Sequence, residues 1–177
     1  MRRLLDRLYQ VAGVMAALCV VAVFVLMIGQ SVLREMGVRT GAVNDVVAWC
    51  CAAAAFLAMA HAFKQGDFVR VTLTLEHVSE ATRRKLEIFA LAVGTAATAY
   101  LAWWANRFTY ESWEFNDTAT GLLPMPLWIP QLSFALGSIL LLVAVLDEFV
   151  IVLRGGRPTY VVAVEQRHAA GDYSGDI

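Results

Sequence analysis

The sequence predicts an all-α membrane protein with four transmembrane helices and a short amphipathic segment between the second and the third. Three observations lead to this fold class. Of the 177 residues, 59% are hydrophobic and the mean hydropathy is +0.62, whereas a soluble domain is about 45–50% apolar. The apolar residues gather in four long blocks, and the charged residues gather between those blocks.

Each block is long enough to cross a bilayer as a helix. A hydrocarbon core about 30 Å thick requires roughly 20 residues at about 1.5 Å per residue. Asp, Glu, Lys and Arg are absent from residues 8–33, 46–63, 88–106 and 118–146. The apolar part of the last block begins near Leu127. We therefore predict spans at about residues 8–33, 46–63, 86–106 and 127–153.

The first block also has some features of a signal peptide. It follows the basic residues Arg2, Arg3 and Arg7. Its apolar run, however, is longer than the ~7–15 residues of a signal peptide's hydrophobic region. Leu18 precedes Cys19, where a lipoprotein signal requires a small residue. We therefore expect an uncleaved first span.

The second and third spans are rich in small residues. Gly41 and Asn44 are expected to interrupt the chain before the second span, which then contains the small residues 50–55. In the third span, small residues recur every four positions, at Ala90, Gly94, Thr98 and Ala102. Small residues allow helix backbones to approach closely in lipid. This pattern predicts packing within a helix bundle, with contact to a partner helix as the alternative.

The connection over residues 66–79 has an ambiguous pattern. Val69, Val71, Leu73 and Leu75 alternate with polar residues, which indicates a strand, but Phe68, Val71, Leu75 and Val78 also share one face of a helix. A lone strand would leave both of its edges unpaired. We therefore favour a short amphipathic segment in the membrane interface, followed by Ser79 as the cap of the third helix.

Prolines precede the fourth span at Pro124, Pro126 and Pro130. Proline is tolerated in the first turn of a helix and not in its interior, so the helix is expected to become regular near Pro130. Gly155, Gly156 and Pro158 should end it. Residues 1–164 are thus predicted to form a single four-helix transmembrane domain, and residues 165–177 a disordered cytoplasmic tail.

Lys and Arg in short connections indicate orientation, because they are enriched on the cytoplasmic side. With four spans, eleven of the fourteen Lys and Arg residues lie on the side of the two termini and the second connection. The other three are Arg34, Arg39 and Arg107. Both termini are therefore predicted to be cytoplasmic.

All five tryptophans fall on the opposite, predicted outer side, at Trp49, Trp103, Trp104, Trp113 and Trp128. Aromatic belts normally occupy both membrane interfaces. The presence of all tryptophans on one side indicates an anchor at the outer interface. The alternative is a periplasmic docking surface, for which Trp113 and Trp128 are the candidates.

The sequence shows no constellation typical of an enzyme or of a cofactor site. His61, His77 and His168 are scattered, and Cys19, Cys50 and Cys51 have no spacing typical of metal ligands. With a net charge of −1, the chain lacks the basic signature of a nucleic-acid-binding protein. The span centres carry no charge of the kind that marks an ion or substrate path. We therefore predict no enzyme activity, no cofactor and no substrate or metal site.

Three segments carry a family resemblance. Asn44-Asp45 precedes the second span, Gly66-Asp67-Phe68-Val69-Arg70-Val71 closes it, and Leu127-Trp128-Ile129-Pro130-Gln131, followed by Gly137, opens the fourth. In this order, with four spans, they make the chain resemble the DctQ-like small membrane subunit of tripartite ATP-independent periplasmic (TRAP) transporters, over residues 8–153. Many relatives have His at the position of Phe68 and Asp at that of Thr72, so no role of those residues is transferred.

The resemblance implies a small subunit that scaffolds a large permease subunit in a bacterial inner membrane. The pair would take up an organic acid, driven by an ion gradient and delivered by a periplasmic binding protein. Candidate contacts with the partner subunit or with membrane lipids are Asp45, Arg70, Gly94 and Thr98. The alternative function is an independent small four-span membrane protein, either a channel or a membrane oxidoreductase.

Overall fold

The computed structural model describes residues 2–66 and 80–169. In these residues the chain forms five helices and no strand. The helices are α1 (Arg2–Glu35), α2 (Gly41–Gln65), α4 (Glu80–Glu114), α5 (Trp128–Leu153) and α6 (Thr159–Ala169). The four longer ones are long and apolar enough to cross a membrane, which confirms the all-α fold class and the four spans.

The helices extend beyond the predicted spans because helical backbone continues past the apolar residues. Helix α4 begins six residues before the predicted third span and ends eight residues after it. Gly41 and Asn44 do not interrupt the chain, since both lie in the first turn of α2. Helix α5 begins at Trp128, so Pro130 lies in its first turn, where proline needs no backbone donor. The predicted amphipathic segment lies outside the described residues, except for Gly66.

Helix α6 was not predicted from the sequence. It continues to Ala169, although the disordered tail was expected to begin at residue 165. The helix is stabilised by tertiary contacts, because Tyr160 is only 3% exposed and packs with Leu91 of α4 and Val152 of α5. Residues 170–177 lie outside the described part of the chain.

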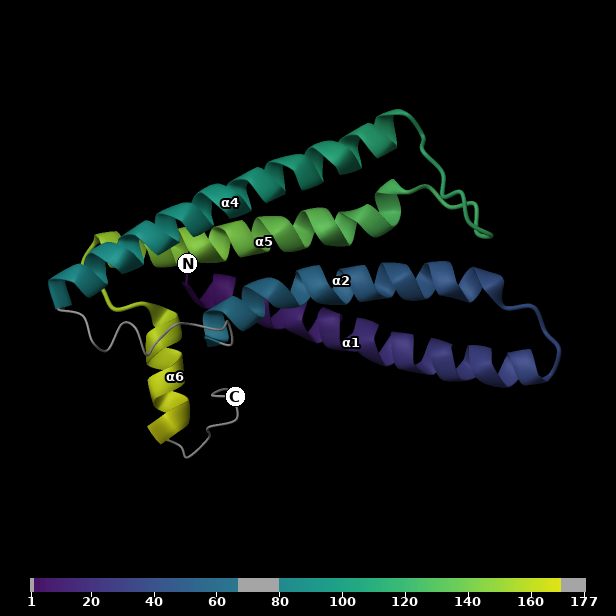
Figure 1. Ribbon diagram of the computed structural model, residues 1–177, viewed down its shortest axis with the longest axis horizontal. Helices are drawn as coiled ribbons and strands as arrows, with labels where there is room; N and C mark the ends of the chain where they lie inside the picture. Colours follow the sequence, from purple (N-terminus) through teal and green to yellow (C-terminus); the bar gives the residue numbers. More distant parts are fainter. Residues whose placement is uncertain (1, 67–79, 170–177) are drawn as a thin grey trace.

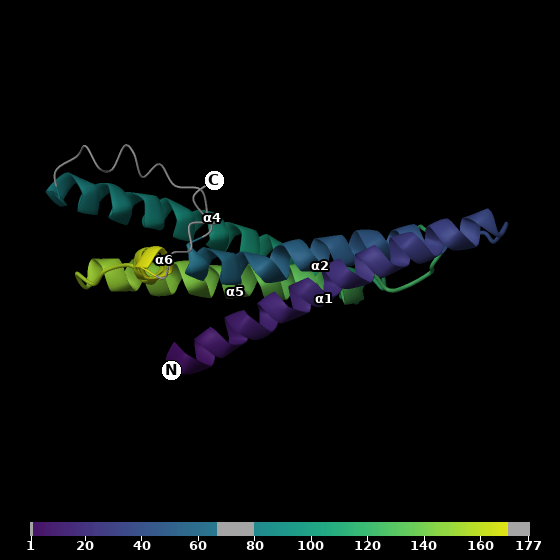
Figure 2. The same cartoon turned by 90° about the horizontal axis from the view of Figure 1, so that it is seen from below.

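The four long helices lie side by side in one layer, in the order α1, α2, α5, α4 (Figure 1). Helix α1 packs chiefly against α2, and α4 chiefly against α5. Seen from below in Figure 2, α1 and α4 diverge to opposite sides at one end, so the layer is twisted. Helix α6 lies at this end, which we call the α6 end. The connections between α1 and α2 and between α4 and α5 lie at the opposite end, the loop end.

Helices α2 and α5 approach each other closely at a glycine. A Cβ atom added at Gly137 would lie 2.5 Å from the backbone oxygen of Phe56. Since that neighbour is backbone, it cannot move aside as a flexible side chain would. The rings of Phe56 and Phe134 pack edge to face beside this contact, with centroids 4.4 Å apart. Gly137 thus sets the distance between the two central helices of the layer.

Among the described residues, the single layer of long helices leaves two broad faces largely without a protein neighbour. The exposed large apolar residues include Val14, Leu18, Val21 and Phe24 along α1. In water such a surface would favour aggregation, but in a bilayer it contacts lipid or other membrane proteins. The chain is therefore a multi-pass membrane protein whose helices are buried mainly by their surroundings.

Candidate functional site

A cluster of charged residues lies at the α6 end of the layer. Lys64, in the last turn of α2, places its Nζ 2.7 Å from Asp147 Oδ2 and 2.7 Å from Glu148 Oε1 of α5. Glu148 is fully buried, and the side chain of Lys64 is only 14% exposed. The ammonium group also lies 5.8 Å from the ring centre of Tyr9 on α1. One lysine thus connects three helices.

Glu148 also holds the start of α6. Its Oε2 accepts a hydrogen bond of 2.9 Å from the backbone N–H of Thr159, and its Oε1 accepts one from the Thr159 hydroxyl. A carboxylate at a helix N-terminus satisfies free N–H groups and interacts favourably with the helix dipole. Glu148 therefore fixes α6 to α5 while neutralising part of the charge of Lys64.

Two further contacts attach α6 to other helices. Arg167 donates a 2.7 Å hydrogen bond to the backbone oxygen of Gln65 at the end of α2. The Tyr160 hydroxyl lies 3.1 Å from Glu87 Oε1 of α4. In addition, a Cβ atom added at Gly66 would lie 2.9 Å from the backbone oxygen of Tyr160, so α6 packs directly on the C-terminal cap of α2. Helix α6 therefore contacts α2, α4 and α5.

Asp45 lies at the opposite end, where α2 begins, and contacts the connection between α4 and α5. A Cβ atom added at Gly121 would lie 3.0 Å from Asp45 Oδ1. The carboxylate therefore rests on the backbone of the connection. Asp45 Oδ2 is buried and has no hydrogen-bond partner among the residues that the structure describes. The structure thus gives Asp45 a contact within its own chain, and its contact with a partner or a lipid stays a prediction.

The connection that Asp45 contacts is a short hairpin. Its two arms are joined by hydrogen bonds of 2.9 Å from the Ala119 N–H to the Met125 oxygen and from the Leu127 N–H to the Asp117 oxygen. Asn116 adopts a positive φ of 52° at the start of the hairpin, a conformation that asparagine tolerates better than most residues. This segment is therefore an ordered element of the loop end.

The structure brings Trp113 and Trp128 together. Both line one groove of about 260 Å³ between α4 and α5. The other lining residues are Asn106, Thr109, Tyr110, Leu132, Ala135 and Leu136. Trp113 is 56% exposed. The two candidate docking residues, separated by the hairpin in the sequence, therefore form one aromatic surface at the loop end.

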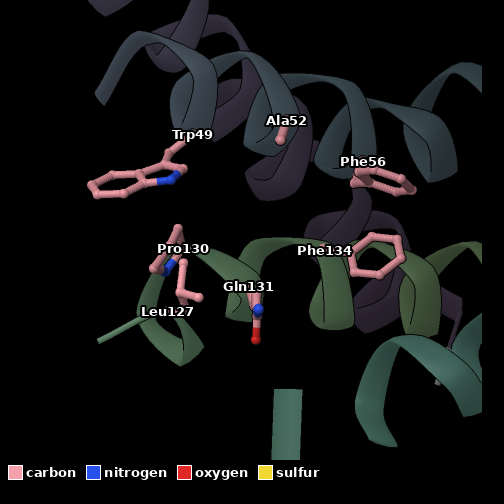
Figure 3. A pocket seen from close by; sticks show the side chains of 7 residues that line it. All are labelled: Trp49, Ala52, Phe56, Leu127, Pro130, Gln131 and Phe134. Carbon is pink, nitrogen blue, oxygen red and sulfur yellow. The ribbon is translucent and has the colours of Figure 1, made fainter. Parts of the chain in front are cut away.

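A second groove, of about 330 Å³, lies between α2 and α5 (Figure 3). Trp49, Ala52 and Phe56 line it from α2, as Figure 3 shows. The residues of the opposite wall are Leu127, Pro130, Gln131 and Phe134. The polar groups of this lining are the Gln131 amide and the indole N–H of Trp49, and none is charged, so the groove suits apolar groups rather than a charged solute.

Gly94 and Thr98 lie on the side of α4 that packs against α5. A Cβ atom added at Gly94 would lie 3.7 Å from Val145 Cγ1, which is ordinary van der Waals contact. The Thr98 hydroxyl donates to the backbone oxygens of Gly94 and Thr95, at 2.9 and 3.1 Å. A role in partner contact stays a prediction for both residues. Arg70 lies outside the described residues.

The described residues contain no group of three or more His, Cys, Asp or Glu side chains that could hold a metal ion. The charged cluster connects helices, and the two grooves present mainly aromatic and aliphatic side chains.

Residues 23–155 match the family model of the DctQ component of tripartite ATP-independent periplasmic transporters. This match covers more than half of the chain. The chain belongs to the DctQ family. A comparison with curated proteins gives no significant match.

Membership in the DctQ family makes the chain a membrane component of a tripartite transporter, and DctQ is a transporter component rather than an enzyme. Lys64 and Glu148 lie within the residues that match the DctQ model, whereas α6 lies beyond them. The charged cluster was missed in the sequence analysis, where Lys64 counted only toward orientation. One feature of the sequence could have predicted it. Lys64 and Glu148 carry opposite charges and lie near the ends of two spans that are predicted to end on the same side of the membrane.

Proposed function

We propose that this DctQ chain is the small subunit of a TRAP-type secondary transporter and scaffolds its large permease subunit. The observation that supports this role most strongly is the single layer of four helices. A closed bundle would bury most of its helix faces internally, whereas this layer, in the part of the chain that the structure describes, leaves both broad faces largely uncovered.

The spans themselves offer little to a charged solute. Their central parts contain no Asp, Glu, Lys or Arg, and the charged cluster lies at the α6 end. A carboxylate solute in the hydrocarbon region requires a positive partner or a water-filled path. The substrate path therefore belongs to the large subunit. In this proposal the substrate is an organic acid, and an ion gradient drives its uptake.

The proposed location is the bacterial inner membrane, with the N-terminus and α6 in the cytoplasm. The distribution of Lys and Arg supports this orientation. The loop end would then face the periplasm, where the aromatic groove of Trp113 and Trp128 is positioned to contact the binding protein.

Co-purification tests the scaffold role. The tagged chain is expressed with the large TRAP subunit of the same organism, extracted in mild detergent and isolated through its tag. We expect the large subunit in a one-to-one complex with the chain. An unrelated four-span protein with the same tag is the control. Equal recovery of the large subunit with both proteins, or none with either, would contradict the proposal.

A further inference from the structure

Two arginines from neighbouring helices lie close together at the α6 end of the layer. Arg84 is in the second turn of α4, and Arg154 is the C-terminal cap of α5. A Cβ atom added at Gly155, the residue after Arg154, would lie 3.4 Å from Arg84 Nη2. The Arg84 guanidinium therefore rests against the backbone at the end of α5, beside Arg154. We call Arg84 and Arg154 the arginine pair.

The arginine pair has no carboxylate partner among the side chains that the structure describes, although both residues are exposed. The carboxylates close to it in the fold contact other groups. Asp147 and Glu148 both bind Lys64. Glu87, one turn after Arg84, accepts a hydrogen bond of 3.1 Å from the Tyr160 hydroxyl. The positive charge of the pair is therefore not neutralised by an ion pair within the described part of the chain.

The end of α5 compensates only a fraction of this charge. The C-terminus of a helix carries about half of a negative elementary charge, whereas the arginine pair carries two positive charges. Like charges repel, and the repulsion is stronger beside a medium of low dielectric constant than in bulk water. The arrangement therefore favours an anion bound by both guanidinium groups.

The depth of the arginine pair indicates where that anion comes from. Arg84 lies four residues before Ile88, where the charge-free run of α4 begins, and thus about 6 Å from it along the helix. Arg154 directly follows Leu153, the last residue of α5. The polar layer on each side of a bilayer core is about 5–8 Å thick. Both arginines are therefore at the depth of the lipid headgroups of one leaflet.

We propose that the arginine pair binds the phosphate group of an anionic phospholipid in the leaflet at the α6 end. A guanidinium group donates two parallel hydrogen bonds to phosphate oxygens, and basic sites between transmembrane helices suit acidic lipid headgroups. The bound phosphate connects α4 to α5 at headgroup depth. In the proposed orientation this is the cytoplasmic leaflet. The inference does not depend on the scaffold role.

A general attraction between a basic surface and acidic lipids is the simpler alternative. Arg157 lies at the same end and is exposed, but its guanidinium pairs with Glu165. It contributes the same formal charge to the surface as each member of the arginine pair. Arg157 is therefore the matched control: loss of its charge changes the general field but leaves the proposed site intact.

Lipid titration of the purified full chain tests the proposal. The delipidated chain in detergent is titrated with dioleoylphosphatidylglycerol or with dioleoylphosphatidylcholine, and native mass spectrometry counts the bound lipids. We expect phosphatidylglycerol to bind about tenfold more tightly than phosphatidylcholine. Arg84→Gln and Arg154→Gln should each weaken the binding of phosphatidylglycerol about fivefold, the effect of one basic residue near an acidic membrane surface. Arg157→Gln should weaken it less than about twofold.

Arg84→Lys separates charge from geometry, because lysine keeps the charge and lacks the planar fork of donors. We expect its affinity for phosphatidylglycerol to lie between those of the wild type and Arg84→Gln. Equal affinity of the wild-type chain for both lipids, or an equal loss in Arg157→Gln, would overturn the proposal. Competition by inorganic phosphate would instead indicate a site for a soluble anion. Displacement of phosphatidylglycerol by the added large subunit would instead assign the arginine pair to a protein carboxylate.

Discussion

Glu148 accepts three hydrogen bonds, one from Lys64 and two from Thr159, with no exposed surface. A buried ionised group is tolerated only when its charge and its hydrogen-bonding capacity are both satisfied. Removing one partner leaves the others uncompensated, so the cost exceeds the value of a single contact. At the residue scale, substitution of this carboxylate should therefore destabilise the structure.

We expect Glu148→Gln to lower the free energy of unfolding by about 1–3 kcal/mol, because Thr159 and Lys64 lose a charged acceptor while Lys64 keeps its ion pair with Asp147. Thermal unfolding of the purified chain in detergent measures this effect. The matched control is Glu165→Gln, which removes the exposed pair with Arg157. That change should cost about 1 kcal/mol or less. Equal shifts in melting temperature for the two variants would show that the buried Glu148 contributes no more to stability than the exposed Glu165.

Gly137 provides a second test at the residue scale. We expect Gly137→Ala to destabilise the contact between α2 and α5 by about 1–3 kcal/mol, because the added methyl group would overlap the Phe56 backbone. The control is Gly29→Ala on α1, where a Cβ atom meets nothing within 4 Å. Unfolding of both variants in the same detergent measures the difference. A Gly137→Ala variant as stable as Gly29→Ala would contradict the close packing.

At the scale of elements, α6 holds neighbouring helices together at one end of the layer. Its contacts reach Gln65 of α2, Glu87 of α4 and Glu148 of α5. Helices α2 and α4 are separated by α5 in the layer, so α6 provides a connection between them that the layer itself does not. The charged cluster is the anchor of this connection.

Removal of α6 should therefore increase and broaden the distance between α2 and α4 at the α6 end. Spin labels at Gln65 and Lys85, after replacement of the native cysteines, report this distance in the full chain and in a chain ending at Pro158. A label pair at Met36 and Phe115 serves as the reference for the loop end and should not change. Identical distributions for the first pair with and without α6 would contradict the role of α6.

The sequence was sufficient for the four long helices but not for α6. Hydropathy identifies the part of a helix that lies in hydrocarbon, so it predicts the spans. It does not predict the charged turns by which α4 extends beyond its apolar run at both ends. Helix α6 is short and partly polar, and isolated helices of that length are marginal in water. Its stability comes from Tyr160 and from Glu148, which are remote contacts that no local pattern reveals.

The sequence predicted where some of the candidate residues lie, while their roles stay predictions. The positions of the tryptophans in the sequence predicted that Trp113 and Trp128 lie at the same end of the helices. In the structure both residues line one groove. The partners of Lys64 could not be predicted, since they depend on which spans are neighbours. Lipid solvates apolar residues on every side of a helix, so the order of helices in the layer leaves little trace in the periodicity of the sequence.

At the scale of the whole molecule, orientation decides which partner meets which end. We expect a cysteine placed at Glu114 to react with a membrane-impermeant thiol reagent added to intact cells from the periplasmic side. A cysteine at Lys85 should react only after the inner membrane is permeabilised. Both variants lack the native cysteines. The reverse labelling pattern would mean that the loop end faces the cytoplasm, contrary to the proposed orientation.

A twisted single layer of four helices has large apolar faces and uncharged span centres. This combination suits a subunit that braces another protein and does not by itself carry a solute. Uptake by reconstituted liposomes tests the claim most directly, with a sodium gradient, labelled organic acids, and the chain added alone or with its large subunit and binding protein. We expect gradient-dependent uptake only when all three components are present. Gradient-dependent uptake by this chain alone would contradict the scaffold role.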